Sequence, residues 1–209
     1  VMVEATGVER RGRITHGCVG LYSDANERAM ARVLAAARAV ALPETKFGIQ
    51  LAHAGRKASA QVPWEGGGAL TADADPWQTV SSTDQPFGPG WHAPEALDAA
   101  GIERSIEAFV QAAIRSVRLG YEVIELHMTH GYLVHQFFSP VSNKRQDAWG
   151  GTPEKRMKLA LDLMQAVRAS VPASVAVGVR IAGSDWMEGG VTIDDAVTLT
   201  SRLKALGAA

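Results

Sequence analysis

The sequence predicts an α/β protein of the (β/α)₈ (TIM) barrel type, with about the second to fifth βα units present. Short apolar runs alternate four times with segments of helical period, which is typical of parallel strands joined by crossover helices. Each expected strand has one apolar face and one polar or small face. Because four units are about half of the eight that a closed barrel requires, we interpret the chain as an internal fragment.

The four expected strands cover residues 1–6, 46–53, 121–127 and 175–181. Their apolar faces carry Val1, Val3, Phe47, Ile49, Leu51, Ile124, Leu126, Val177, Val179 and Ile181. Their other faces carry Glu4, Gly48, Gln50, Glu125, His127, Ala176, Gly178 and Arg180. Helices cover both faces of a doubly wound sheet, so both should be apolar. A barrel interior can be polar where a ligand sits, so we prefer the barrel to the open sheet.

Helices with ordinary start signals follow the expected strands, and their apolar residues recur every three or four positions. The stripe of the first helix is Met30, Val33, Leu34 and Ala37. The expected starts are Asp24 and Asn26, about Ile102, Thr152 as an N-cap before Pro153, and Thr192 before the acidic Asp194 and Asp195. The second helix should end at Leu119 because Gly120 follows it.

Residues 54–100 form a connection much longer than the few residues normal for a βα loop, and it is rich in Gly, Pro and Trp. Long ordered loops usually form lids or walls of a site. We therefore expect one domain over residues 1–209, truncated at both ends, with an active-site loop at 54–100.

Composition excludes several classes of partner. The 21 basic and 22 acidic residues are interspersed, with no basic patch for nucleic acid or a membrane surface. No apolar run approaches the length of a membrane span. Cys18 is the single cysteine, so it can form no internal disulfide, which favours a reducing cytoplasm. We expect small-molecule partners.

The strongest candidates for chemistry are His127, His130 and Tyr132, at the carboxyl end of the third expected strand. Barrel enzymes place catalytic groups there. Imidazole N–H groups can stabilise negative charge on a carbonyl oxygen, and a tyrosine hydroxyl can deliver a proton. Zinc binding by the two histidines is an alternative, but no third ligand stands at matching spacing.

Two further candidate residues lie on the same polar face of the expected strands as His127. Arg180 ends the fourth strand, where a guanidinium suits an electron-rich or anionic ring system. An ion pair with Glu125 or Glu4 is the alternative for this arginine. Gln50 could hydrogen-bond the edge of a heterocycle through its amide. Cys18 is interpreted as structural.

These residues lie in motifs that closely resemble those of the Old Yellow Enzyme family over essentially the whole chain. The motifs are Glu4-Ala5-Thr6-Gly7, Gly12-Arg13-Ile14-Thr15, Gly48-Ile-Gln50-Leu-Ala-His53-Ala-Gly55-Arg56-Lys57, Pro63-Trp64, His127-x-x-His130-Gly-Tyr132-Leu-x-His-Gln136-Phe-x-Ser-Pro140, Ser142-Asn143-Lys-Arg145, Val179-Arg180-Ile181 and Asp185-Trp186. The His-x-x-His form resembles the bacterial subclass of thermophilic-like and xenobiotic reductases.

The resemblance implies a barrel that binds FMN, takes hydride from NADPH or NADH and reduces the activated C=C bond of α,β-unsaturated carbonyl or nitro compounds. It implies that His127 and His130 hold the substrate oxygen and that Tyr132 donates the proton. It assigns flavin contacts to Gln50, Arg180 and the backbone of Ala5. It also implies a homo-oligomer at full length.

Some features depart from the family pattern. Met128 and Thr129 replace two smaller residues, and Trp149 replaces a commoner tyrosine or phenylalanine. The strands expected to bind the FMN phosphate are absent, so we predict weak FMN binding by this chain alone. A 2,4-dienoyl-CoA reductase, an amine dehydrogenase relative and an inactive fragment are the alternatives within this fold, and a metal-dependent hydrolase is the alternative outside the family.

Overall fold

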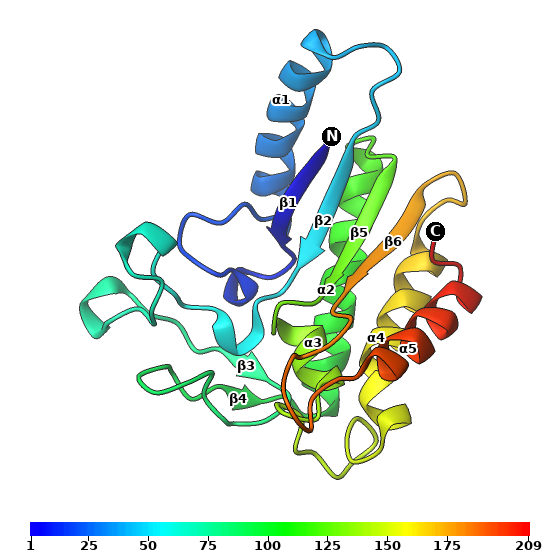
Figure 1. Ribbon diagram of the computed structural model, residues 1–209. Helices are drawn as coiled ribbons and strands as arrows, with labels where there is room; N and C mark the ends of the chain where they lie inside the picture. Colours follow the sequence, from blue (N-terminus) through cyan, green and yellow to red (C-terminus); the bar gives the residue numbers. More distant parts are fainter.

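A four-stranded parallel sheet forms the centre of the computed structural model, which describes residues 1–209 (Figure 1). Its strands, in spatial order, are β1 (Met2–Gly7), β2 (Gly48–Ala52), β5 (Val123–Met128) and β6 (Ala176–Ile181). Spatial order follows sequence order, with a helix between successive strands, as in a barrel wall. The predicted strands are thereby confirmed, with shifts of one or two residues at their ends.

The strand register places the polar residues of the inner face side by side. Gln50 lies opposite Glu125, and His127 lies opposite Arg180. On the opposite face of the sheet, Ile49, Ile124 and Val177 are aligned with one another and fully buried. The alternation of faces expected from the sequence is therefore present across the sheet.

Four long helices accompany the sheet: α1 (Asp24–Val40), α2 (Ala99–Arg118), α4 (Pro153–Ser170) and α5 (Ile193–Ala205). Phe109 of α2 and Met164 of α4 belong to the same 27-residue apolar core as the strand residues Ile49 and Ile124. The helices thus pack on the apolar face of the sheet. The opposite face, which carries Gln50 and His127, is the inner face of the barrel wall.

The helix caps agree in part with the sequence. Thr152 caps α4, and Thr192 caps α5 in a capping box with Asp195. The first helix begins at Asp24, as predicted, and its N-cap is Ser23, whose hydroxyl accepts the hydrogen bond from Asn26 N. Helix α2 begins three residues before Ile102, because Asp98 accepts from Gly101 N.

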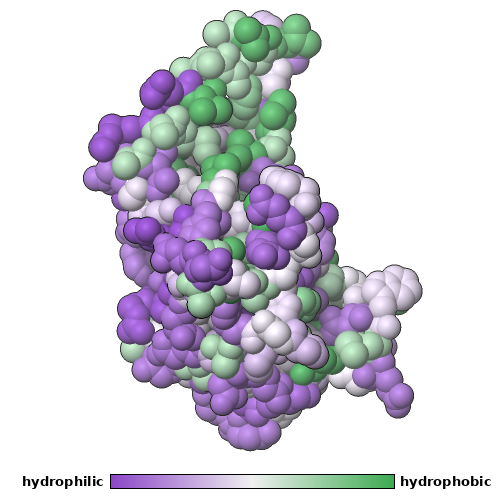
Figure 2. All heavy atoms as spheres, turned by 90° about the vertical axis from the view of Figure 1, so that its left-hand side faces the viewer, coloured by the Kyte–Doolittle hydropathy of each residue, from purple (hydrophilic) through white to green (hydrophobic).

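Val33, which belongs to the apolar stripe expected for the first helix, does not join the core. It is 64% exposed, whereas Met30 and Leu34 on the same helix are buried. Helix α1 stands beside β1 at the edge of the sheet, so only a narrow stripe of it is covered (Figure 1). Val40 and Leu42, at the carboxyl end of α1, are also exposed. Figure 2 shows apolar residues gathered at this end of the molecule, at the top of the view.

Several short elements lie between the strands and the long helices. β3 (Val80–Ser81) and β4 (Glu95–Ala96) form a small parallel pair within the long loop, and α3 (Leu133–Phe138) follows β5 directly. The long loop also contains the 3₁₀ turns Gly55–Lys57, Pro63–Glu65 and Ala72–Ala74. No helix is both long enough and apolar enough to cross a membrane.

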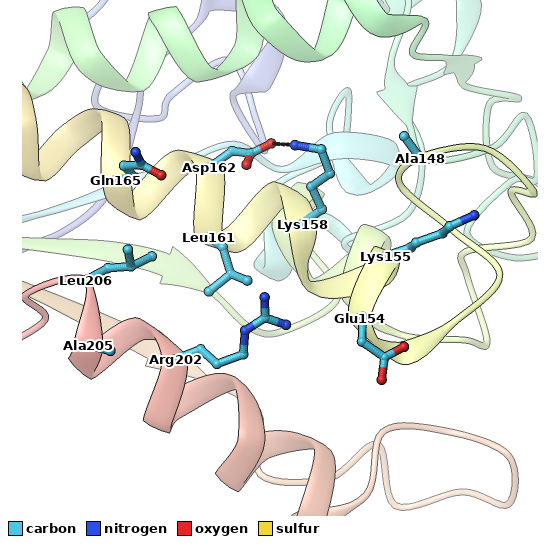
Figure 3. Close-up of a pocket in the computed structure, with 10 residues that line it drawn as sticks. All are labelled: Ala148, Glu154, Lys155, Lys158, Leu161, Asp162, Gln165, Arg202, Ala205 and Leu206. Atoms are coloured by element: carbon cyan, nitrogen blue, oxygen red, sulfur yellow. Dashed lines mark hydrogen bonds and ion pairs between the residues drawn. The ribbon is translucent and has the colours of Figure 1, made fainter.

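A groove of about 570 Å³ separates α4 from α5 on the outer helical layer (Figure 3). Its charged side chains include Lys158 and Asp162, which pair at 2.6 Å, and Arg202 from α5. These residues lie on the helices and not at the strand ends, so we assign no chemistry to the groove.

Candidate active site

The turn after β5 brings three aromatic side chains together. His130 and Gly131 both have positive φ, at 59° and 71°, which reverses the chain immediately after the strand. The Nε2 atom of His127 lies 3.2 Å from Nδ1 of His130. The ring of Tyr132 lies 5.0 Å from that of His127 and 6.3 Å from that of His130. The three side chains proposed from sequence to be catalytic therefore form one cluster.

The contact between the two histidines has a definite direction. Thr129 N donates to Nδ1 of His127, so the neutral His127 ring carries its hydrogen on Nε2. That hydrogen is donated to Nδ1 of His130, which leaves His130 with its own hydrogen on Nε2. Burial, aided by the charges of His130 and Arg180, lowers the pKa of His127 to about 4. Burial also lowers the pKa of His130, with help from Arg180. Both rings are therefore neutral hydrogen-bond donors at pH 7.

Tyr132 is kept as a neutral phenol. Its burial raises its pKa above 10, and the neighbouring Cys18 and Glu4 act in the same direction. The ammonium of Lys57 lies 5.2 Å from the Tyr132 ring centre and 4.8 Å from that of Phe87. Lys57 also donates to the carbonyl of His130 at 2.9 Å. The long loop thus supplies a cation to the site. Sequence reasoning assigned no role to Lys57, although it stands in a quoted motif.

The turn after β5 is also held by a second histidine, His135, and the carboxylate of Asp185. Nδ1 of His135 accepts from Gly131 N at 2.9 Å, and its Nε2 donates to Asp185 at 2.8 Å. Asp185 also accepts from Ser139 Oγ and Val191 N. Burial alone would raise the pKa of Asp185, but the hydrogen bonds from His135 and Ser139 outweigh it and lower the pKa to about 2. Sequence reasoning missed this link between the loops after β5 and β6.

The inner face beside the histidines carries the residues that the resemblance assigns to the flavin. Ala5 has φ of 34° at a register shift in β1, and its N–H donates to Oε1 of Gln50. Nε2 of Gln50 donates to Glu125 at 2.6 Å. Arg180 is exposed and forms no ion pair, so the alternative pairing with Glu125 or Glu4 does not occur.

This donor set fits a flavin ring. Arg180 offers an unpaired positive charge, which suits a ring that gains negative charge on reduction. A side chain built on Gly178 would meet nothing within 4 Å, so a planar ring has space beside Arg180. On β2, the NH₂ group of Gln50 has a second hydrogen besides the one that it donates to Glu125.

Two other sequence interpretations concern metal binding and Cys18. No group of three or more His, Cys, Asp or Glu side chains is arranged to hold a metal ion. The Cys18 sulfur accepts from Thr15 N at 3.2 Å and lies 3.5 Å from its hydroxyl.

Comparison with known proteins places this geometry in a family. The model of the NADH:flavin oxidoreductase / NADH oxidase family matches residues 1–208. The chain belongs to this family. The resemblance to Old Yellow Enzymes is thereby confirmed, whereas the narrower bacterial subclass stays a prediction.

Named relatives agree with the family. NADH:flavin oxidoreductase FG08077 of Gibberella zeae is 40% identical over 90% of this chain and 46% of its own length. The NADPH dehydrogenase of Geobacillus thermodenitrificans is 35% identical over 99% of this chain and 55% of its own length. The chain thus spans about half the length of the curated relatives it matches.

Solved structures agree with a partial barrel. Morphinone reductase in complex with tetrahydroNAD has a TM-score of 0.80 at 25% identity, covering 99% of this chain and 58% of that one. A 2-naphthoyl-CoA reductase has a TM-score of 0.83 at 22% identity, covering 99% of this chain and 31% of that one, which shows the fold alone. The barrel-type fold predicted from sequence is confirmed.

Proposed function

We propose that this chain forms the substrate-activating wall of an FMN-dependent NAD(P)H oxidoreductase that reduces the activated C=C bond of α,β-unsaturated carbonyl or nitro compounds. The observation that carries the proposal is the neutral His127–His130 pair beside the phenol of Tyr132. Membership of the flavin oxidoreductase family and the names of the relatives support the reaction class.

The histidine pair would polarise the substrate. A carbonyl or nitro oxygen that accepts N–H hydrogen bonds from His127 and His130 gains negative charge, which makes the β-carbon more electrophilic. A neutral imidazole can donate a hydrogen bond without placing a positive charge in the site. The low pKa of His127 keeps this ring neutral. FMN, if bound here and reduced by NADPH or NADH, would supply the hydride to the β-carbon.

Tyr132 would complete the reduction by donating its phenolic proton to the α-carbon. Lys57 stands over the tyrosine ring and favours the negative charge that the oxygen then carries. Arg180, Gln50 and the Ala5 backbone would hold the flavin ring against this wall. The guanidinium of Arg180 would lie beside the edge of the flavin that becomes negative on reduction. The remaining contacts to FMN would come from outside these residues.

Location and assembly are part of the same proposal. A single cysteine suits a reducing cytoplasm. The family resemblance supports a homo-oligomer at full length, which size-exclusion chromatography with light scattering tests.

The decisive experiment is a visible spectrum of the protein expressed from its complete reading frame. We expect a flavin spectrum that bleaches with NADPH under anaerobic conditions and returns when cyclohexenone is added. A protein that stays colourless after FMN is supplied would contradict the flavoenzyme proposal. A flavin that bleaches but is not reoxidised by the enone would contradict only the substrate class.

A further inference from the structure

A second polar cavity lies between the turn that follows β1 and the long loop. Its volume is about 310 Å³. It is lined by Arg10, Arg11, Arg13, His16, Asp75 and Trp77. The proposed reaction uses none of these side chains, although Arg13 stands in one of the motifs that resemble the family.

The walls of the cavity are fixed by hydrogen bonds and stacking. Nε of Arg13 donates to the carbonyl of Arg10 at 2.9 Å, and one of its Nη atoms donates to the carbonyl of His16 at 3.3 Å. The guanidinium stacks 5.0 Å over the Trp77 ring. The indole N–H of Trp77 donates in turn to the carbonyl of Arg11 at 2.9 Å. Arg13 is therefore held in place with several of its N–H groups still free.

The cavity has an excess of positive charge. Arg11 is paired with Glu9 at 2.6 Å, but Arg10 and Arg13 form no ion pair. Asp75 is the single carboxylate in the lining. Two unpaired guanidinium groups beside an aromatic ring are suited to an oxyanion with several oxygens, above all a phosphate, because each guanidinium can offer two parallel N–H donors.

The cavity lies at the edge of the sheet that carries the active site. The turn follows the carboxyl end of β1, and Gly12 packs so closely on His53 that a Cβ there would lie 2.6 Å from the ring. The carbonyl of His53 accepts from Leu133 N, the first residue of α3 after the catalytic turn. The same β1 turn continues to Cys18, which is close enough to Tyr132 to influence its pKa. A long ligand at the active site could therefore reach the cavity.

We propose that this cavity binds a phosphate group of the nicotinamide dinucleotide, with the guanidinium groups of Arg10 and Arg13 as its ligands. The inference rests on the proposed function, because it needs a nicotinamide donor at the neighbouring site. Two phosphates have the required chemistry: the diphosphate that NADH and NADPH share, and the 2′-phosphate that NADPH alone carries.

The test is Arg10→Gln in the flavin-loaded protein, followed by anaerobic stopped-flow reduction with NADPH and with NADH. The Arg10 side chain makes no hydrogen bond or ion pair, so its loss should leave the fold intact. We expect an apparent Kd for NADPH that is raised about tenfold or more, as for loss of a charge-assisted contact. Arg10→Lys should restore part of the affinity. Arg28→Gln, which removes an exposed and unpaired arginine of α1, is the matched control and should change nothing.

The pattern of affinities identifies the phosphate. A loss for NADPH alone, with weaker inhibition by adenosine 2′-monophosphate, assigns the cavity to the 2′-phosphate. An equal loss for both nucleotides assigns it to the diphosphate. Unchanged affinities for both in Arg10→Gln and Arg13→Gln overturn the inference while leaving the proposed function standing. If neither NADPH nor NADH reduces the flavin of the unaltered protein, the proposed function itself is overturned.

Discussion

At the scale of single residues, the proposed role of Tyr132 is to donate the proton that must follow the hydride. Replacing Tyr132 with Phe removes only the hydroxyl, whose raised pKa keeps it protonated at neutral pH. We expect reoxidation of the reduced flavin by an enone to slow about 10²–10⁴-fold, the usual contribution of a general acid. Flavin reduction by NADPH should be unchanged, because it needs no proton from this residue. Stopped-flow measurement of the two half-reactions separates these effects.

Tyr121→Phe is the matched control, because the Tyr121 hydroxyl is buried in the core without a hydrogen-bond partner. Both half-reactions should keep their rates in that variant. Reoxidation of Tyr132→Phe at the unaltered rate would remove Tyr132 from the mechanism.

His127 should make folding sensitive to mild acid. Its pKa in the folded chain is about 4, against about 6.5 for an exposed histidine. Below pH 6.5 the unfolded chain therefore binds a proton that the folded chain does not, so the free energy of unfolding falls as the pH falls from 6.5 toward 4. The loss from this group between pH 7.5 and 5.0 is on the order of 2 kcal/mol.

Urea unfolding at the two pH values checks this expectation. The drop in the free energy of unfolding should be smaller in His127→Gln than in the unaltered protein. A residual drop is expected from His130, whose pKa is lowered in the same direction. Equal drops in both proteins would show that His127 is not the sensitive group.

At the scale of elements, the contact from His135 to Asp185 joins α3 to the loop after β6. An asparagine at position 185 could not satisfy its neighbours in either orientation. Its NH₂ group would face Val191 N–H in one orientation and the Nε2–H of His135 in the other, because Nδ1 of His135 is occupied by Gly131 N–H. One buried donor would lose its partner, which costs about 1–3 kcal/mol.

Thermal and urea unfolding of Asp185→Asn measure that cost. Asp162→Asn is the control, because it breaks a half-exposed ion pair with Lys158 whose loss should cost at most about 1 kcal/mol. The Kd of a ketone ligand should also rise in Asp185→Asn, since the turn that carries His130 loses its anchor. Stability and ligand affinity equal to those of the control would refute the anchoring role.

The elements that the sequence predicted differ from the features that it missed in two respects: their length, and how far apart in the sequence their contacting residues lie. The long helices and the strand faces follow from periodicity, and His127 and Arg180 could be placed on one inner face for that reason. Helix α3 has only six residues, too few for a period. Lys57 meets His130 across 73 positions, and Asp185 meets His135 across 50. Such contacts depend on how the loops fold over the strand ends, which local pattern does not specify.

At the scale of the whole molecule, the sheet has two strands with an open edge, β1 and β6. The chain also spans about half the length of its curated relatives. In barrels of this type the phosphate of a cofactor is commonly bound by loops after the last strands. We therefore expect the isolated 209-residue chain to bind FMN weakly or not at all, although it holds residues that fit the flavin ring.

A fluorescence titration of the isolated chain with FMN measures this affinity, with riboflavin as the control ligand. Because the phosphate contacts are the ones expected to be absent, the two ligands should bind with similar weak affinity. Tight, saturable binding of FMN but not of riboflavin would show that a phosphate site exists within these residues.

The single hydrogen between His127 and His130 has a consequence for how fast a ligand can be captured. A carbonyl oxygen that enters between the rings needs a hydrogen from each nitrogen, but Nδ1 of His130 has none while it accepts from His127. His130 must first exchange tautomers, losing the hydrogen on Nε2 and gaining one on Nδ1, a relay that a solvent molecule can carry. Ligand association should therefore slow in heavy water by more than the higher viscosity explains, whereas a cluster with both hydrogens already in place would show the viscosity effect alone.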